Sequence, residues 1–302
     1  MSQKLIVVVG ATGNQGGSVA RRFLKAGFRV RGLTRNVTSS AATALASSGM
    51  EVVQADLDDP DSLKKAFKGA NIIFSVTNYW EPFFRPDCRK EAEEMDMSCR
   101  EYAYDVEFLQ GKNISDAAAT TVDSLDDNGF LVSTLSHADK CSDGRFQELY
   151  HFDGKADIFP AYHDDGTFTM EFTTSPDKPV PHFDPVGDMG NFTYAVSQMP
   201  PGKAYMAAGT TCTWPEFLNT WAEVNGVKAS YKQVTSEEMI NATEDRDTGI
   251  ELEHMFSYSS DPGYDGGMEL LTAEDIKTIG IDCPMTSWES WAKKNDWSSV
   301  LA

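Results

Sequence analysis

The sequence has 302 residues, 41% of them hydrophobic, which is enough to bury the core of one large or two smaller globular domains. Its 46 acidic residues against 26 basic ones give a formal net charge of −20, which excludes broad attraction to nucleic-acid backbones or anionic membranes. No apolar run approaches the roughly 20 residues of a membrane span. Met1–Lys4 leads directly into a short strand-like run rather than a targeting segment. We therefore expect a cytoplasmic or nuclear protein with no direct nucleic-acid or membrane partner.

Cysteine usage indicates neither a zinc site nor a disulfide framework. The five cysteines are widely separated, at Cys88, Cys99, Cys141, Cys212 and Cys283. None forms a C-x-x-C pair, and the histidines also lack the spacing of metal ligands. We expect reduced thiols, as in an intracellular protein, and no metal.

The first half of the chain alternates predicted strands and helices. Leu5–Val9 is a continuous β-branched run, typical of a strand buried on both faces of a parallel sheet. Apolar residues then recur at helical spacing as far as Gly27, where a helix would end. Further strands are predicted at Phe28–Leu33, Glu51–Ala55, Asn71–Val76 and Gly129–Ser133, with a short helix from about Pro60 and a long one over much of Cys88–Ala119. This alternation predicts an α/β fold with a doubly wound, parallel, Rossmann-type sheet.

Three glycines, Gly10, Gly13 and Gly16, stand between the first predicted strand and the first helix. Glycine lets the backbone turn sharply and approach a pyrophosphate, and the free N–H groups and positive dipole end of the following helix favour an anion. Glycines are also common in purely structural turns. Their place between a clear strand and a clear helix, with further strand–helix units after them, favours a nucleotide site.

The end of the second predicted strand indicates which dinucleotide is bound. NAD sites usually place Asp or Glu about 20 residues beyond the glycines, where it binds the ribose hydroxyls. Here no acid occurs between Gly32 and Ser40, and Arg35 can pair with a 2′-phosphate. NADP(H) is therefore favoured over the alternative, a solvated surface arginine. Asp56 and Leu57, just past the third strand, either flank the adenine or belong to a plain Asp-rich turn.

An aromatic segment, NYWEPFFRP, follows the fourth predicted strand. It supplies Tyr79, Trp80, Phe83 and Phe84. Ligands bind beyond the carboxyl ends of strands in this architecture. These rings therefore either cover the nicotinamide or an aromatic substrate, or form a hydrophobic plug under a loop.

The second half contains smaller α+β elements. Strands are predicted in GTFTMEFTT and SYKQVT, and helices after Asp184, in TTCTWPEFLNTWAEVNG and in TSWESWAKKNDW. The middle helix has Thr213 as its cap, Glu216 three residues later and Gly226 at its end. The tryptophans near the carboxyl terminus are expected to pack in the core rather than form a binding cage. We expect a dinucleotide-binding domain at 1–158 and a smaller substrate or partner domain at 159–302.

The combination of motifs resembles a known family. GATGNQGGSVA, LTRN, ADLDD, VTNYWEPF, QGKNISDAAA and YHFDGKADI are similar to segments of the NmrA-like family, atypical members of the short-chain dehydrogenase/reductase group. PPGKAYMAAG, TWPEFLNTWAEVNGV and SWESWAKKNDWSSVL look like fungal members in particular. The resemblance covers nearly the whole chain. It implies NADP(H) bound by Gly10, Thr12, Gly13, Asn14, Gln15, Gly16, Arg35, Thr77, Asn78 and, at the nicotinamide ribose, Lys155.

Typical short-chain reductases carry Tyr-x-x-x-Lys on one helical face, and the tyrosine donates a proton as hydride arrives. Here the position four before Lys155 is His151, as is usual in NmrA-like proteins, and Tyr150 is one step off. His151 either acts as the acid, since its ordinary pKa of about 6.5 suits neutral pH, or packs at the pocket wall. Lys155 either holds the cofactor or is a surface helix lysine. The hydroxyl residues within 133–136 either contact a substrate carbonyl or satisfy strand-end backbone groups.

One region departs from the family pattern. Family members continue from the lysine helix into a further sheet strand and a substrate loop, whereas here 11 residues separate Lys155 from the strand-like run at Thr167. A parallel crossover needs about a dozen or more residues for the connection alone. We therefore expect the sixth strand to be absent or replaced near 156–166, which would leave a sheet edge that something must cover.

Two functions fit this sequence. The first is an NADP-dependent oxidoreductase that reduces a small carbonyl, imine or enone substrate, with His151 or a bound water as proton donor. The second is a non-catalytic NADP(H) redox sensor that regulates a protein partner. The aromatic segment favours the enzyme slightly, and nothing in the residues identifies the substrate, the partner or the oligomeric state.

Overall fold

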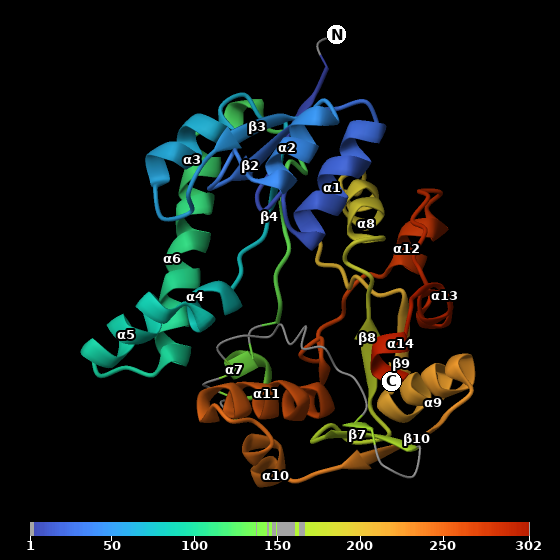
Figure 1. The fold of residues 1–302 in the computed structure, drawn as a ribbon. Helices are drawn as coiled ribbons and strands as arrows, with labels where there is room; N and C mark the ends of the chain where they lie inside the picture. The colour runs from blue at the N-terminus through green and yellow to red at the C-terminus, as the bar shows by residue number, and fades with distance from the viewer. Residues whose placement is uncertain are drawn as a thin grey trace.

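The amino-terminal half of the chain is built on a five-stranded parallel sheet (Figure 1). The computed structural model describes residues 3–136, 138–143, 145–146, 149, 161–162 and 167–301. The strands are β1 (Leu5–Val8), β2 (Arg29–Thr34), β3 (Glu51–Gln54), β4 (Ile72–Ser75) and β5 (Phe130–Val132). They lie in the order β3-β2-β1-β4-β5, and every pair is parallel. The predicted doubly wound sheet is confirmed.

Helices cover both faces of this sheet because β1 and β4 are buried at every position. On one face α3 (Pro60–Phe67) and α6 (Cys99–Ala119) pack against alternate residues of β1, among them Leu5 and Val7. On the other face α1 (Asn14–Lys25), α2 (Ser40–Ser47) and α8 (Met189–Val196) pack against Ile6 and Val8. The alternation of side chains along β1 thus divides the core between two helical layers.

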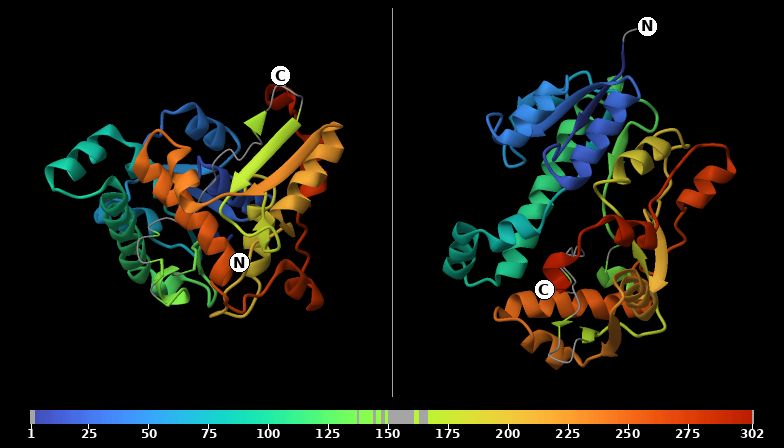
Figure 2. Two further views of the ribbon diagram at one scale, coloured as in Figure 1. Left: turned by 90° about the horizontal axis from the view of Figure 1, so that it is seen from below. Right: turned by 45° about the vertical axis from the view of Figure 1, so that its right-hand side comes forward.

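α8 belongs to the second half of the chain but lies beside α1 (Figure 2). The two helices meet where Gly190 faces Ser18: the Gly190 N–H donates to Ser18 Oγ at 3.0 Å, and a Cβ at Gly190 would lie 2.4 Å from the Ser18 carbonyl oxygen. The Arg22 guanidinium lies 3.8 Å from the centre of the Tyr194 ring. Residues far beyond the sheet in sequence therefore complete one of its helical layers.

The second half forms two small sheets around an aromatic core. β7 (Thr167–Phe172) pairs in parallel with β10 (Lys228–Gln233) and antiparallel with β6 (Ala161–Tyr162), and β8 (Pro179–His182) pairs antiparallel with β9 (Thr210–Thr213). The helices of this half are α9 (Trp214–Asn225), α10 (Ser236–Asn241), α11 (Arg246–Tyr258), α12 (Ala273–Thr278), α13 (Trp288–Lys294) and α14 (Ser298–Leu301), and α7 (Ala138–Cys141), from the segment after β5, packs on the same core. Stacked rings, such as Phe172 on Phe256 at 4.0 Å and Phe217 on Trp288 at 3.8 Å, fill this core. The tryptophans pack as expected.

The predicted caps of α9 are confirmed. The Thr213 hydroxyl accepts from the Glu216 N–H, the Glu216 carboxylate accepts from the Thr213 N–H, and Gly226 ends the helix at φ 67°. This capping box satisfies two N–H groups that the helix itself leaves unpaired, and glycine tolerates the left-handed conformation at the other end.

The long helix predicted over much of Cys88–Ala119 is confirmed as α6, but the break that separates α6 from α5 (Pro86–Glu94) was not predicted. Asp96 adopts φ 57° at the break, and the Ser98 hydroxyl caps α6 by accepting from the Glu101 N–H at 3.1 Å. One predicted helix start is wrong: α8 begins at Met189 rather than just after Asp184. The Asp184 side chain accepts from the N–H groups of residues 186 and 187 and holds a turn there.

β5 is the last strand of the parallel sheet among the residues that the structure describes. The expected sixth strand has no counterpart among them, and most of 156–166 lies outside the described ranges. Part of the edge beside β5 meets the end of α8, since Asn128 Nδ2 donates to the carbonyl oxygens of Val196 and Met199 at 2.7 and 3.1 Å.

α6 joins the two halves through a buried ion pair. Arg100 Nε donates to Glu251 Oε2 of α11 at 3.0 Å, and the two side chains are 4% and 1% exposed. The Tyr79 hydroxyl donates to the Arg100 carbonyl oxygen beside this pair. Charges buried this deeply must stay paired, because removing one partner leaves the other charge with neither a counter-ion nor water to stabilise it. The amino-terminal part of α6 is therefore held against α11, while its other end packs on the sheet.

His182, at the end of β8, is a buried titratable side chain. Its ring lies 4.4 Å from the Phe217 ring and 5.1 Å from the Trp214 ring, centre to centre. Its Nε2 atom has no hydrogen-bond partner among the described residues. Because burial penalises the charged imidazolium, the pKa of His182 is lowered from 6.5 to about 4.

We expect this histidine to make the fold less stable as the pH falls from about 6.5 towards 4. The unfolded chain binds the proton below its ordinary pKa, whereas the folded protein resists it, so unfolding becomes easier by about 2 kcal/mol between pH 6.5 and 5. Urea unfolding at several pH values measures this loss. His182→Phe should abolish that share of the pH dependence. If the free energy of unfolding of this variant fell with pH as steeply as that of the wild type, the assignment to His182 would be wrong.

Candidate functional site

The predicted dinucleotide-binding residues follow the carboxyl ends of four neighbouring strands. Gly10 to Gly16 connect β1 to α1, Arg35 follows β2, Asp56 and Leu57 follow β3, and Thr77 and Asn78 follow β4. All four strands are parallel, so these ends meet at one edge of the sheet (Figure 1). The strand order changes direction between β1 and β4, which is where ligands bind in open α/β sheets.

Two glycines of the turn are required by its geometry. Gly10 has φ 65°, in the left-handed region that side chains disfavour. A Cβ at Gly16 would lie 2.3 Å from the Gly10 carbonyl oxygen and 2.7 Å from that of Val9. The helix can therefore start this close to the strand only because residue 16 has no side chain.

The first turn of α1 is prepared for an anion. Its N-cap residue, Gly13, is extended at φ −92° and ψ −179° and offers no side-chain cap, and the first turn contains no acidic residue. The last turn carries Arg22 and Lys25, which suit the negative end of the helix dipole. Thr12, Gly13 and Asn14 are exposed. The free N–H groups of this turn thus lack a negative partner within the helix, and a phosphate can supply one.

Gln15 connects the glycine turn to the end of β5. The Ser133 hydroxyl donates to Gln15 Oε1 at 2.8 Å, and the Ser133 N–H donates to the Ser75 carbonyl oxygen of β4 at 2.9 Å. Ser133 therefore contacts the glycine turn as well as satisfying the strand end. The carbonyl oxygen of Gln15 is engaged by Ser133, and no hydrogen bond from its amide N–H groups to a described residue is formed, so these groups can donate to a ligand.

Arg35 is paired with a carboxylate from a different part of the chain. Its Nη1 donates to Glu81 Oε1 at 2.8 Å, and Glu81 Oε2 lies 3.5 Å from Arg85 Nη1. The hydrogen bond that Arg35 donates to the Glu81 carboxylate raises the pKa of Arg35 above its ordinary value. Arg35 thus lies at an exposed position, and its guanidinium is paired with the Glu81 carboxylate.

The turn that follows β3 is held by α6. Asn113 Nδ2 donates to the Leu57 carbonyl oxygen at 2.8 Å, and Gln110 Nε2 donates to Asp58 Oδ1 at 3.1 Å. Three residues before Gln110, Glu107 accepts from the Thr77 hydroxyl at 2.7 Å. These α6 residues and Glu81 were missed from the sequence. The three α6 residues recur at every third position, which places them on one face of the helix and was the available signal, whereas no local signal marked Glu81.

The aromatic segment divides into two parts. It forms a short helix, α4 (Trp80–Phe84), in which Phe83 is completely buried, as is the preceding Tyr79. These two rings pack against Ala103 of α6 and form the hydrophobic plug. Trp80 stacks on Phe84 at 5.4 Å, and Phe84 is 57% exposed. This second pair of rings can still face a ligand.

His151 and Lys155, the two candidate catalytic residues, lie outside the described residues. Near them in sequence, the Ser136 hydroxyl forms a hydrogen bond of 2.7 Å with the Tyr258 hydroxyl of α11. Burial raises the pKa of Tyr258 to about 12. Tyr258 is fully buried, so it fixes the segment after β5 against α11 and does not face solvent.

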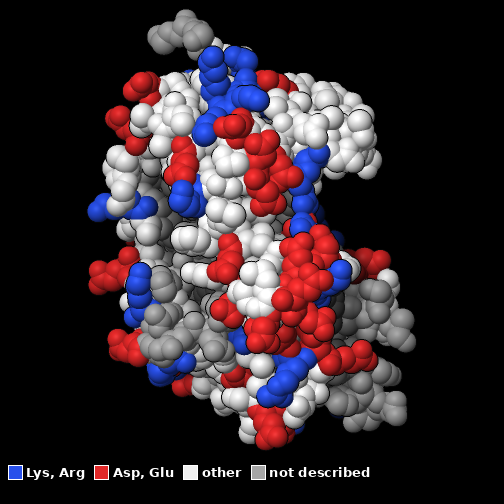
Figure 3. All heavy atoms as spheres, turned by 90° about the vertical axis from the view of Figure 1, so that its left-hand side faces the viewer, with Lys and Arg blue, Asp and Glu red and all other residues white. Residues whose placement is uncertain are grey.

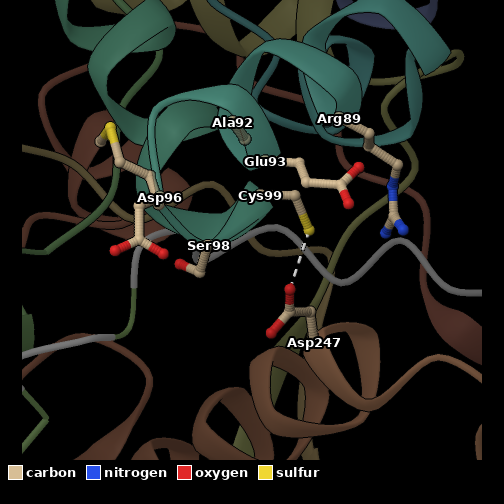
Figure 4. A pocket seen from close by; sticks show the side chains of 8 residues that line it. Arg89, Ala92, Glu93, Asp96, Ser98, Cys99 and Asp247 are labelled. Atoms are coloured by element: carbon tan, nitrogen blue, oxygen red, sulfur yellow. Dashed lines mark hydrogen bonds between the residues drawn. The ribbon is translucent and has the colours of Figure 1, made fainter.

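A separate polar cavity of about 570 Å³ lies at the amino-terminal end of α6 (Figure 4). It is lined by Arg89, Ala92, Glu93, Asp96, Met97, Ser98, Cys99 and Asp247. The Cys99 thiol donates to Asp247 Oδ2 at 3.0 Å, and burial raises its pKa to about 12. Arg89 is already paired with Asp245 at 2.9 Å. Three carboxylates against one arginine make this lining unsuitable for the phosphates of a dinucleotide.

Carboxylates also dominate the outer face formed by α5 and the first half of α6 (Figure 3). The exposed acids there are Asp87, Glu91, Glu93, Glu94, Asp96, Glu101 and Asp105. A face of this charge repels phosphate-rich partners. Among the described residues, no helix is both long and apolar enough to cross a membrane, and no group of side chains is arranged to hold a metal ion.

Comparison with known sequences agrees with the resemblance to the NmrA-like family. The model of the family described as NmrA-like matches residues 2–161. An NmrA-like family domain-containing oxidoreductase, cpsB of Aspergillus campestris, is 28% identical over 269 residues, which cover 80% of this chain and 78% of that protein.

Two kinds of solved structure share the fold. NmrA, a negative transcriptional regulator, is 17% identical in its complex with NADP, with a TM-score of 0.68 over 97% of this chain and 95% of that one. The same regulator with NAD gives a TM-score of 0.70 at the same coverage and identity. The NADPH-dependent quinone oxidoreductase of Escherichia coli, complexed with NADPH, gives 0.63 at 17% identity, over 96% of this chain and 99% of that enzyme.

Proposed function

This chain belongs to the NmrA-like family, and from that premise we propose that it binds NADP(H) and reduces a small carbonyl, imine or enone substrate. The observation that supports cofactor binding best is the uncapped first turn of α1, next to the strand-order reversal between β1 and β4. Free N–H groups and the positive end of a helix dipole together form a suitable binding site for a diphosphate. The residues present therefore fit the cofactor.

The phosphorylated dinucleotide is favoured by Arg35. No acid follows β2 at the place where NAD sites usually hold the ribose hydroxyls, and an exposed guanidinium stands there instead. Thr77 and Asn78 follow β4 on the other side of the turn, and Asp56 and Leu57 border the adenine side. The amide group of Gln15, at the start of α1, is a further donor for the cofactor.

The cofactor, when bound, supplies the hydride. The chain's own residues therefore have to bind the cofactor, orient the substrate and protonate it. We assign the proton to His151 or to a bound water, and the contact with the nicotinamide ribose to Lys155, on the grounds of sequence. The partly exposed rings of Trp80 and Phe84 offer an apolar surface beside the β4 end. The quinone reduced by the Escherichia coli enzyme is a conjugated dicarbonyl, which falls within the proposed substrate class.

A second function is supported by the likeness to a regulator. NmrA is described as a negative transcriptional regulator, and the shared fold extends over 97% of this chain. In this alternative the protein binds NADP(H) without turnover and reports its redox state to a regulatory protein. In either case we place the cofactor in residues 1–158 and the substrate or partner side in 159–302.

Arg35→Ala should weaken NADP(H) binding by about tenfold and change NAD(H) binding by less than about twofold, because it removes a charge-assisted contact that only the extra phosphate makes. Titration calorimetry with both dinucleotides measures this. Lys25→Ala removes an equal charge at the far end of α1 and should leave both affinities unchanged. Equal weakening of NADP(H) and NAD(H) by Arg35→Ala would contradict the cofactor assignment.

Incubation with NADPH and a panel of carbonyls, imines and enones should give cofactor oxidation. His151→Ala and Lys155→Ala should each lower kcat/KM by about tenfold or more, as expected when a proton donor or a cofactor contact is lost. Lys203→Ala, an exposed lysine far along the chain, is the matched control. No oxidation with any substrate, together with tight binding of one redox form of the cofactor, would favour the sensor over the enzyme.

A further inference from the structure

The ion pair between Arg35 and Glu81 crosses the edge of the sheet where the dinucleotide is expected. Arg35 follows β2, and Glu81 lies in α4 after β4. The sheet order places β1 between these two strands. The pair therefore joins elements on the two sides of the β1–α1 turn, with a distance of 2.8 Å between Arg35 Nη1 and Glu81 Oε1.

Glu81 occupies a position that also suits a phosphate. One carboxylate oxygen accepts from Arg35, and the other lies 3.5 Å from Arg85 Nη1. A phosphate monoester carries up to two negative charges and three strong acceptor oxygens, and it binds guanidinium groups in the same forked manner as a carboxylate. Arg85 Nε also donates to Asp87 Oδ1 at 2.9 Å, so Arg35 is the main guanidinium for a phosphate in place of Glu81, and Arg85 is a second one nearby.

The carboxylate can be displaced without moving its helix. Arg35 is 58% exposed and Glu81 28% exposed, so water screens the pair and makes it easy to exchange. The backbone around Glu81 is fixed, since Tyr79 and Phe83 are completely buried against α6. Only the Glu81 side chain has to turn away.

We propose that Glu81 determines the dinucleotide specificity of this site by competing with the 2′-phosphate for Arg35. This inference rests on the proposed NADP(H) function. A phosphorylated dinucleotide displaces the carboxylate and engages Arg35, with Arg85 as a second guanidinium. A dinucleotide without the phosphate leaves the ion pair intact. Glu81 therefore lowers the affinity for NADP(H) but not the affinity for NAD(H). The preference for NADP(H) over NAD(H) is then smaller than it would be if Arg35 and Arg85 had no carboxylate between them.

Glu81→Gln tests this, because it keeps the shape of the side chain and removes its charge. Titration calorimetry of the intact protein should show NADP⁺ and adenosine 2′,5′-bisphosphate binding about three- to tenfold more tightly, with NAD⁺ and AMP unchanged. The bisphosphate carries the ribose phosphate without the nicotinamide, so it isolates the contact with Arg35. The effect should shrink at high salt, where exposed charges are screened.

Two variants make the result specific. Glu94→Gln removes one charge from the Lys90–Glu94 pair of α5, so it changes the net charge equally and should leave NADP⁺ binding unchanged. In a protein that already carries Arg35→Ala, adding Glu81→Gln should increase NADP⁺ affinity much less than it does in the wild type. A double-mutant cycle measures this difference.

Equal changes for NADP⁺ and NAD⁺ in Glu81→Gln, or weaker NADP⁺ binding, would overturn the role of Glu81 and leave the proposed function standing. An equal gain in Glu94→Gln would also overturn it. If the wild-type protein binds neither dinucleotide, the proposed function itself fails and this inference fails with it.

Discussion

The close contact between the first turn of α1 and the end of β1 is the constraint on which the amino-terminal half depends. Gly16 lies so near the carbonyl oxygens of Gly10 and Val9 that no side chain fits between helix and strand. The contact directs the start of α1 to the strand-order reversal between β1 and β4, where its N–H groups meet the edge of the sheet. It also sets the layer that α8 completes, since Gly190 packs on Ser18 of the same helix. One packing requirement thus serves both the fold and the proposed binding site.

α6 extends this arrangement to the rest of the molecule. At one end, Gln110 and Asn113 hold the turn after β3, and Glu107 holds Thr77 after β4. At the other end, Arg100 is buried in its ion pair with Glu251 of α11. A single helix of 21 residues therefore contacts the turns after β3 and β4, at the proposed cofactor edge, and the second half of the chain. The buried ion pair fixes the position of α6 relative to α11, because moving either partner would leave the other charge buried without its partner.

Local patterns predicted the fold better than they predicted the site. The five strands, the glycine turn and the capping box of α9 each follow from residues close together in sequence, such as Thr213 and Glu216. The break before α6 was missed because the helical pattern continues across it, although Ser98 and Glu101 stand at the spacing of a capping motif that marks a helix start. The contacts of Arg35 with Glu81 and of Gln15 with Ser133 join residues 46 and 118 positions apart, and periodicity carries no information at that range. The roles of His151 and Lys155 remain predictions from sequence, since both lie outside the described residues.

The central claim is that the bare first turn of α1 receives the diphosphate of a phosphorylated dinucleotide. A crystal structure of the protein grown with NADP⁺ tests it most directly. The account predicts diphosphate oxygens within hydrogen-bonding distance of the N–H groups that begin α1, with the ribose phosphate on Arg35. A dinucleotide found elsewhere, for example in the polar cavity beside Cys99 and Asp247, with the start of α1 unengaged, would contradict it.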